Sequence, residues 1–214
     1  MVIVVGSQNG GVGKTTIATN LAVWLSKQAG NDVLLVDADD QGSASDFTAW
    51  REQTRSGDVG YTLVQLIGAN LRKQIESLAP KYTHIVIDTG GRDTTTQRAA
   101  LFVCDVLLVP FNPRAYDLWT VTKISNLVEE IQVARTTPMR AFSFINRADI
   151  QSQDNRQVGE ALMEFPQLEF LDSPVRNRKA FANSAAVGLA VSEYQVLDAK
   201  AINEIDSLFT KITS

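Results

Sequence analysis

Glycines, a lysine and two threonines gather in one short segment of this chain. Residues 9–16 read Asn-Gly-Gly-Val-Gly-Lys-Thr-Thr, after an apolar run at residues 2–5 and before an apolar stretch with helical spacing. A strand that turns through glycines into a helix presents backbone N–H groups and a positive helix end to phosphate. Lys14 would neutralise phosphate charge there, and the Thr15 hydroxyl would hold Mg²⁺. The sequence therefore predicts a phosphate-binding loop made of Gly10, Gly11, Val12, Gly13, Lys14, Thr15 and Thr16.

Acidic residues follow two further apolar runs. Asp37 and Asp39 come at the end of the run 33–36, and Asp88 directly follows the run 84–87. Because ligands of open parallel sheets bind at the carboxyl ends of the strands, we expect these carboxylates to converge on the phosphate loop. Asp88 would then support Mg²⁺ directly or through a neighbour. Asp37 and Asp39 lie on the same side of an extended segment, so either one could orient an attacking water.

Together these segments resemble the motifs of the ParA/MinD family of P-loop ATPases, whose loop is a deviant Walker A motif. The resemblance continues in order through residues 109–113, 116–119, 145–147 and 188–194, and it is strongest to the short ParA type that segregates plasmids. It implies an ATP-bound homodimer that comes apart after Mg²⁺-dependent hydrolysis to ADP. It also implies that Asp39 is the hydrolytic aspartate and that Asp37 and Asp88 support metal and water, with Asn146, Arg147 and Pro174 near the nucleotide.

The chain departs from the expected motifs at three positions, two at the loop and one after the second apolar run. Gln8 stands where the usual phosphate-loop spacing has glycine. Asn9 stands where the family has a signature lysine that reaches the partner's phosphates, and an amide brings no positive charge to that place. Asp40 replaces a proline that is common after the hydrolytic aspartate. Asn9 is either a natural variant compensated by another basic residue, for which Arg147 is our candidate, or a substitution for lysine.

Short apolar runs alternate with segments of helical apolar spacing along the chain. This alternation predicts an α/β fold with a mainly parallel sheet and helices on both of its faces. With 214 residues and 44% hydrophobic content, we expect one P-loop domain over 1–214, without an N-terminal helix-turn-helix domain. The predicted strands are 2–6, 33–37, 84–88, 105–110 and 141–145, and the predicted helices lie near 14–29, 94–103, 116–136 and 155–164.

The first predicted strand begins at residue 2, which leaves no room for a signal peptide, and no apolar run approaches the ~20 residues that span a bilayer. We therefore expect a cytoplasmic protein.

The single cysteine, Cys104, lies in an apolar run and is expected to be an inert core thiol. The lone His84 has no second histidine or cysteine nearby and is a poor metal-ligand candidate.

A final apolar stripe with helical spacing runs from Val196 to Ile212. MinD-type proteins end in a basic amphipathic helix that binds membrane, so the charge of this segment is informative. Its polar face carries more acidic than basic residues, namely Asp198, Glu204 and Asp206 against Lys200 and Lys211. An anionic membrane surface would not favour this face, and we expect the helix to dock on the protein's own sheet.

The net charge of −4 does not indicate a nucleic-acid-binding protein, but one local cluster is basic. Arg176, Arg178 and Lys179 lie within four residues, just before a run with helical spacing. In the resembled family, basic residues of this region bind DNA without sequence preference when the protein is an ATP-bound dimer. Phosphate contacts alone would support such binding. The alternative interpretation is a solvated charge cluster near the nucleotide base.

These observations favour an ATP-driven positioning switch that associates with the nucleoid. The ATP dimer would bind DNA, and a ParB-like or other cargo-adaptor protein would trigger slow hydrolysis and release, which segregates a plasmid or chromosome. One alternative cargo is a protein compartment such as a carboxysome, which Asn9 slightly favours. Another alternative is a P-loop metabolic enzyme with substrate-binding loops after residues 88 and 110. The presence of Asp37, Asp39 and Asp88 argues against a module that binds ATP without hydrolysing it.

Overall fold

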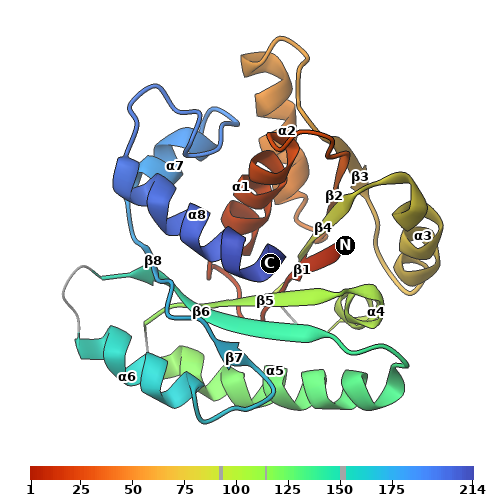
Figure 1. Cartoon of the computed structure of the whole chain (residues 1–214), viewed down its shortest axis with the longest axis vertical. Helices are drawn as coiled ribbons and strands as arrows, with labels where there is room; N and C mark the ends of the chain where they lie inside the picture. The colour runs from red at the N-terminus through yellow and green to blue at the C-terminus, as the bar shows by residue number, and fades with distance from the viewer. Residues whose placement is uncertain (92–93, 114, 150–152) are drawn as a thin grey trace.

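A parallel sheet forms the centre of the molecule (Figure 1). The computed structural model describes residues 1–91, 94–113, 115–149 and 153–214, with backbone only for 115–119. Among these residues the strand order is β3-β2-β4-β1-β5-β6-β7, with β8 paired to β6, and all these pairings are parallel. The strands are β1 Val2–Val5, β2 Val33–Ala38, β3 Thr62–Gln65, β4 His84–Thr89, β5 Val106–Phe111, β6 Arg140–Ala148, β7 Glu169–Phe170 and β8 Val175–Arg176.

Helices cover both faces of this sheet, as the sequence predicts (Figure 1). The first face is covered by α1 Lys14–Ser26, α2 Ser43–Thr54, α7 Lys179–Ala185 and α8 Ala199–Thr213. The opposite face is covered by α3 Leu71–Leu78, α4 Thr95–Val103, α5 Ala115–Ala134 and α6 Gln153–Leu162, with a 3₁₀ turn at Ala79–Lys81 after α3. Because both faces are buried, the central strands are continuously apolar instead of alternating.

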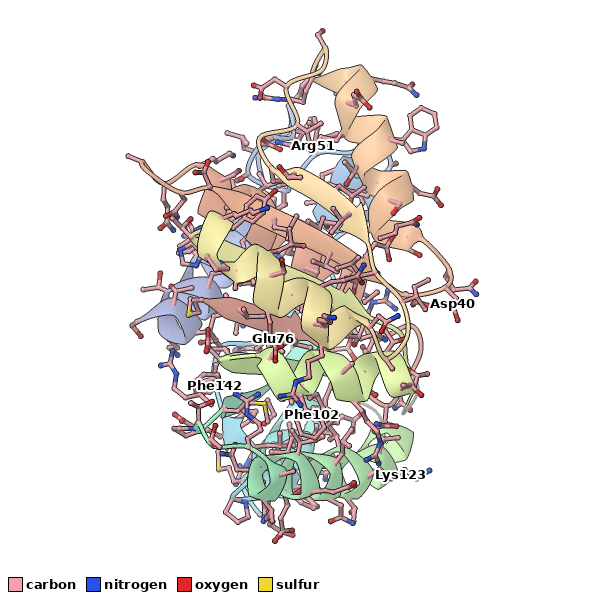
Figure 2. All side chains as sticks on the ribbon, turned by 90° about the vertical axis from the view of Figure 1, so that its right-hand side faces the viewer. Asp40, Arg51, Glu76, Phe102, Lys123 and Phe142 are labelled. Carbon is pink, nitrogen blue, oxygen red and sulfur yellow. The ribbon has the colours of Figure 1, made fainter. Side chains whose placement is uncertain are left out.

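The elements absent from the sequence prediction are α2, α3, β3, β7 and β8. Two of these strands have only two residues each, which is too short for a periodic signal. The helix α3 is largely polar and packs through Leu71 and Ile75. The Arg72 side chain of α3 also reaches α4, where its guanidinium lies 5.2 Å from the ring centre of Phe102. Within α3, Arg72 pairs with Glu76; Figure 2 labels Phe102 and Glu76.

The C-terminal helix α8 docks on the sheet, which confirms the expectation. Its buried residues join the core beneath α1 and β1, and Trp24 donates a hydrogen bond of 2.9 Å to Asp206. The expected stripe is too long at its start, because Asp198 caps the helix and Val196 and Leu197 lie outside it, exposed. Among the described residues, no helix is both long enough and apolar enough to cross a membrane. The buried residues of α8 are Ala201, Ile205, Leu208, Phe209 and Ile212.

The cysteine is also where the sequence predicts it. Cys104 is buried and unpaired by disulfide, and burial raises the pKa of its thiol to about 12. A thiol with so high a pKa carries almost no thiolate at neutral pH. Cys104 therefore belongs to the core and not to a reactive site.

A buried ion pair fastens α2 to the segment between α7 and α8. Arg51 donates to both carboxylate oxygens of Glu193, at 2.6 and 2.9 Å, and its side chain is only 2% exposed. Figure 2 shows Arg51 on the inner side of α2. Gly188 lies against this helix at φ +67°, and a Cβ there would lie 2.1 Å from the backbone nitrogen of Arg51. Only glycine fits so close to the backbone of α2. Gly188 and Glu193 together therefore give the segment 188–194 a structural role, which is to hold α2 in place.

Glu193→Ala is expected to lower the free energy of unfolding by about 3–5 kcal/mol, because it leaves the buried Arg51 charge without its partner. Urea denaturation followed by circular dichroism measures the change. Glu76→Ala is the matched control, since Glu76 pairs with Arg72 at 3.0 Å but both side chains are about half exposed. Its loss should be at most about 1 kcal/mol. Equal losses in the two variants would contradict a special contribution from the buried pair.

Candidate functional site

The glycine-rich loop runs from β1 into α1, as its sequence predicts. Gly13 is the N-cap of α1 and adopts φ +93°, a left-handed conformation that favours glycine. Its neighbour across the sheet is Asn146, at the end of β6, and a Cβ on Gly13 would lie 2.3 Å from the amide nitrogen of Asn146. That amide donates a 2.7 Å hydrogen bond to the carbonyl of Val12. The loop is thus pinned from β6 at the point where the helix begins.

Lys14 lies inside this loop. Its side chain is buried, and its ammonium donates a 2.9 Å hydrogen bond to the carbonyl of Asn9. Burial lowers the pKa of Lys14, while the negative charges of Asp88 and Asp39 oppose that shift. The ammonium is therefore held at the centre of the loop with two carboxylates nearby.

Asp88 is the carboxylate that the sheet places beside the loop. In the strand register, Asp88 lies opposite Val5 of β1 on one side and opposite Asp37 of β2 on the other. The side chain is 1% exposed, and neither carboxylate oxygen has a hydrogen-bond partner among the described residues. The pKa of Asp88 is raised to about 7, mainly by burial and also by the negative charges of Asp37 and Asp39, while the Thr15 hydroxyl and the Lys14 ammonium oppose the shift.

Asp37 and Asp39 take different positions. Asp37 is fully buried, and its carboxylate accepts hydrogen bonds from the backbone N–H of Ser45 at 2.8 Å and from the Ser45 hydroxyl at 2.6 Å. Because Ser45 lies in the first turn of α2, Asp37 satisfies an N-terminal donor of that helix. Asp39 is partly exposed and lines the pocket of the phosphate loop. Its carboxylate lies against Gly90, where a Cβ would be 3.4 Å away.

The pocket around the loop is open and has a volume of about 680 Å³. It is lined by Gly10, Gly11, Gly13, Lys14, Thr15, Thr16, Asp39, Asp40, Gln41, Ser43, Gly90, Gly91, Thr94 and Arg147. Asp40 is exposed on the turn after β2 and points away from the body of the molecule (Figure 2).

A smaller cavity of about 150 Å³ adjoins this pocket beside Asn146. Arg147 lines both spaces and adopts φ +52°, a left-handed conformation uncommon for arginine. The hydrophobic side chain of Phe181 forms part of the wall of the smaller cavity. Pro174, the third residue expected near the nucleotide base, lines a different cavity between β6 and α6.

The basic cluster is engaged with α8. Glu204 accepts hydrogen bonds from the guanidinium groups of Arg176, at 2.7 Å, and Arg178, at 2.6 Å. Although partial burial acts in the opposite direction, these bonds hold the pKa of Glu204 below its usual range, and the same pairing raises the pKa of Arg178. Lys179 is exposed at the start of α7. Two of the three predicted DNA contacts are thus also ion-paired inside the chain.

The residues at the loop fit a magnesium ion. Mg²⁺ prefers one or two carboxylates, water and phosphate oxygens, and Asp88 offers two buried oxygens without hydrogen-bond partners beside the Thr15 hydroxyl. Within the described ranges, no group of three or more His, Cys, Asp or Glu side chains forms a metal cage of its own. A cation bound here would therefore depend on phosphate oxygens for much of its coordination.

Comparison with known protein families decides the assignment. The family model of the CobQ/CobB/MinD/ParA nucleotide binding domain matches residues 3–191. The chain belongs to this family. The match spans the loop, the three acidic positions and residues 188–191, so the resemblance to ParA/MinD ATPases is confirmed.

Relatives within the family carry two kinds of names. The chain is 24% identical to maintenance of carboxysome distribution protein A of Halothiobacillus neapolitanus, over 98% of this chain and 95% of the relative. It is 30% identical to the protein of the same name from Gloeobacter kilaueensis, over 93% of this chain and 87% of the relative. It is 26% identical to the chromosome partitioning protein ParA of Myxococcus xanthus, over 61% of this chain and 59% of the relative.

Solved structures show the same fold. Apo McdA of Cyanothece superposes with a TM-score of 0.83 at 18% identity, covering 100% of this chain and 99% of the other. A putative plasmid partition protein of Borrelia burgdorferi bound to AMPPNP superposes with a TM-score of 0.75 at 21% identity, covering 99% and 97%. The fold is therefore that of the ParA/MinD P-loop proteins.

Sequence reasoning missed several residues that hold the site together. Ser45 binds Asp37, and Thr89 donates to the carbonyl of Val5 at 3.2 Å. Gln97 of α4 contacts Ser7 and Gln8. The Thr94 hydroxyl accepts a hydrogen bond from the N–H of Gln97 and caps the start of α4.

Proposed function

We propose that this protein is a ParA-type ATPase that forms a homodimer when ATP and Mg²⁺ bind and separates after hydrolysis to ADP. The observation that carries this proposal is the convergence of Lys14, Asp39 and Asp88 on one glycine-rich loop, where the Asp88 carboxylate has no hydrogen-bond partner among the described residues. A positive charge, a metal-competent carboxylate and a second carboxylate in one pocket suit phosphoryl transfer to water. Family membership and the nucleotide-bound structural neighbours support the same activity.

Each residue then has a task in this proposal. The backbone N–H groups of 10–16 hold the phosphates, and Lys14 neutralises their charge. Thr15 and Asp88 hold the metal, which would supply charge stabilisation to the reacting phosphate. Asp39 lines the pocket and orients the attacking water. Asp37 acts on the site indirectly, because its carboxylate accepts hydrogen bonds from the N–H of Ser45 in α2 and, at 3.3 Å, from the backbone N–H of Asp39. Asn146 and Arg147 line the smaller cavity, which would receive the base.

The ATP-bound homodimer would bind DNA without sequence preference through the basic cluster. Replacing Arg176, Arg178 and Lys179 together with alanine is expected to weaken binding to all DNA sequences about equally and to flatten the salt dependence, because fewer counterions are released. Fluorescence anisotropy with ATP at several salt concentrations measures both effects. The exposed Lys179 should contribute most, since Glu204 already neutralises both arginines in part.

A charge-matched control removes three positive charges on the opposite face, from Arg72, Lys73 and Lys81. All three are exposed, and Arg72 is also ion-paired, so the control matches both the net charge and the pairing of one residue. DNA affinity should fall much less in this variant. If both triple variants bind equally well, the basic cluster is a solvated surface and DNA binds elsewhere.

For the cargo, we propose a protein compartment such as a carboxysome. The names of the two relatives matched over nearly the whole chain support this choice, although the plasmid or chromosome was the first expectation from the sequence. Segregation of DNA is the second candidate, supported by the ParA relatives and the plasmid partition fold neighbour. In either case a ParB-like or other adaptor protein would stimulate hydrolysis at the nucleoid.

The neighbouring open reading frames separate the two cargoes. A small basic DNA-binding protein beside a set of direct repeats would establish segregation, and shell-protein genes would establish compartment positioning. The encoded neighbour should then increase phosphate release from ATP in the presence of DNA. A metabolic enzyme of the same family would instead need a small-molecule acceptor, so DNA-dependent hydrolysis without one would exclude that alternative.

A further inference from the structure

The side chain of Asn9 is fastened within its own chain. Its amide Nδ2 donates a 3.3 Å hydrogen bond to the hydroxyl of Thr120. Thr120 lies on α5, 111 residues further along the sequence and outside every segment that the phosphate-loop motifs identify. A helix of the opposite sheet face therefore contacts the loop at the position where the family has its signature lysine.

The backbone of Asn9 determines where the Lys14 ammonium lies. The Asn9 carbonyl accepts the 2.9 Å hydrogen bond from Lys14 and a 2.8 Å bond from the Ser7 hydroxyl. Gly91 closes the other side of this peptide, because a Cβ there would lie 2.7 Å from the Asn9 oxygen and 2.7 Å from the Gly10 nitrogen. Any rotation of the Asn9 peptide would thus move the acceptor of the Lys14 ammonium.

The two residues before Asn9 are fixed by another helix of the same face. Gln97 of α4 is fully buried, donates to the Ser7 carbonyl at 3.3 Å and accepts from the side chain of Gln8 at 3.2 Å. Gln8 occupies the usual glycine position of the motif, so this contact explains how the larger residue is accommodated. With Ser7 and Gln8 held by α4, the Thr120 hydrogen bond is a contact from α5 that orients the Asn9 side chain.

We propose that Thr120 is a positioning residue for nucleotide binding, which acts through Asn9 on Lys14. This inference rests on the proposed ATPase function. It assigns Asn9 a role within its own subunit: the amide orients the first peptide of the loop and keeps the Lys14 acceptor in place. In a preorganised loop the ammonium meets phosphate without rearrangement, which lowers the cost of binding.

Thr120→Val keeps the shape of the side chain and removes the hydroxyl, whereas Thr120→Ser keeps the hydroxyl. We expect Thr120→Val to weaken binding of a fluorescent ATP analogue about 3- to 10-fold, the usual range for one lost hydrogen bond. Thr120→Ser should bind within about 2-fold of the unmodified protein. Thermal denaturation checks that both variants fold, and Thr120→Ala serves as the hydroxyl-free variant if valine disturbs the helix.

A double-mutant cycle separates positioning from a general structural effect. In an Asn9→Ala background, Thr120→Val should have no further effect on nucleotide affinity, because the Asn9 side chain through which Thr120 acts on the loop is already absent. An unchanged affinity in Thr120→Val, or a full additional loss in the Asn9→Ala background, would overturn the inference. Lack of ATP binding by the unmodified protein would instead contradict the proposed ATPase function, so the two failures are distinguishable.

Discussion

Lys14→Ala is expected to abolish the conversion of monomer to dimer by ATP and Mg²⁺. The ammonium is the buried positive charge at the centre of the loop, and its removal leaves phosphate to face Asp88 and Asp39 without compensation. ATP hydrolysis should fall by about 10²–10³ or more, as when one preorganised donor to the transition state is lost. Sedimentation with and without ATP measures the assembly. The unmodified protein should gain mass with ATP, and the variant should not.

Asp39→Ala is the companion variant that separates binding from chemistry. Because Asp39 lines the pocket while the Lys14 ammonium is held by the Asn9 carbonyl, the variant should bind ATP, become dimeric and remain on DNA while hydrolysis stops. If turnover persists, Asp37 is the next candidate for orienting water, despite its two hydrogen bonds to Ser45. An ATP-induced dimer in Lys14→Ala would show that nucleotide-dependent dimerisation does not need the Lys14 ammonium.

The sequence predicts the centre of the site because its parts are local. Lys14 follows the glycines directly, and Asp39 and Asp88 follow apolar strands whose carboxyl ends must meet in a parallel sheet. The strand register confirms that meeting, since Asp88 lies between Val5 and Asp37. Short-range spacing and one rule of sheet topology are sufficient for these residues.

What the sequence does not predict depends on distant or weakly patterned partners. Asp37 binds Ser45 at the start of α2, a helix whose residues show almost no apolar periodicity. Arg178 reads as an exposed basic residue until α8, 26 residues later, places Glu204 against it. Thr120 gives no signal at all, because one threonine on a long helix is identified only when the fold brings it to Asn9. Side-chain contacts between distant elements are therefore the part of the site that sequence patterns do not predict.

The second large effect concerns the charge that the family lysine would have supplied. A cation that stabilises the transition state in related phosphoryl transfers is worth roughly 10³–10⁵ in rate, and a neutral amide recovers little of it. Arg147 is the compensating candidate, because it is exposed and lines both the phosphate pocket and the adjoining cavity beside Asn146. Its left-handed backbone conformation coincides with the register irregularity between Asn146 and Ala148, where β6 pairs with β8.

We therefore expect Arg147→Ala to lower ATP hydrolysis by at least about 10²-fold, within the range that a catalytic cation supplies. Arg156→Ala is the control, since Arg156 is largely exposed on α6, pairs with Glu160 and lines neither space.

Asn9→Lys should give little gain if Arg147 already supplies the charge, and it would lose the amide that binds Thr120. A large gain in Asn9→Lys together with an unaffected Arg147→Ala would show instead that Asn9 stands in place of an original lysine. If steady-state hydrolysis, with and without DNA, changes in neither variant, then the transition state at this site does not depend on a cation from either position.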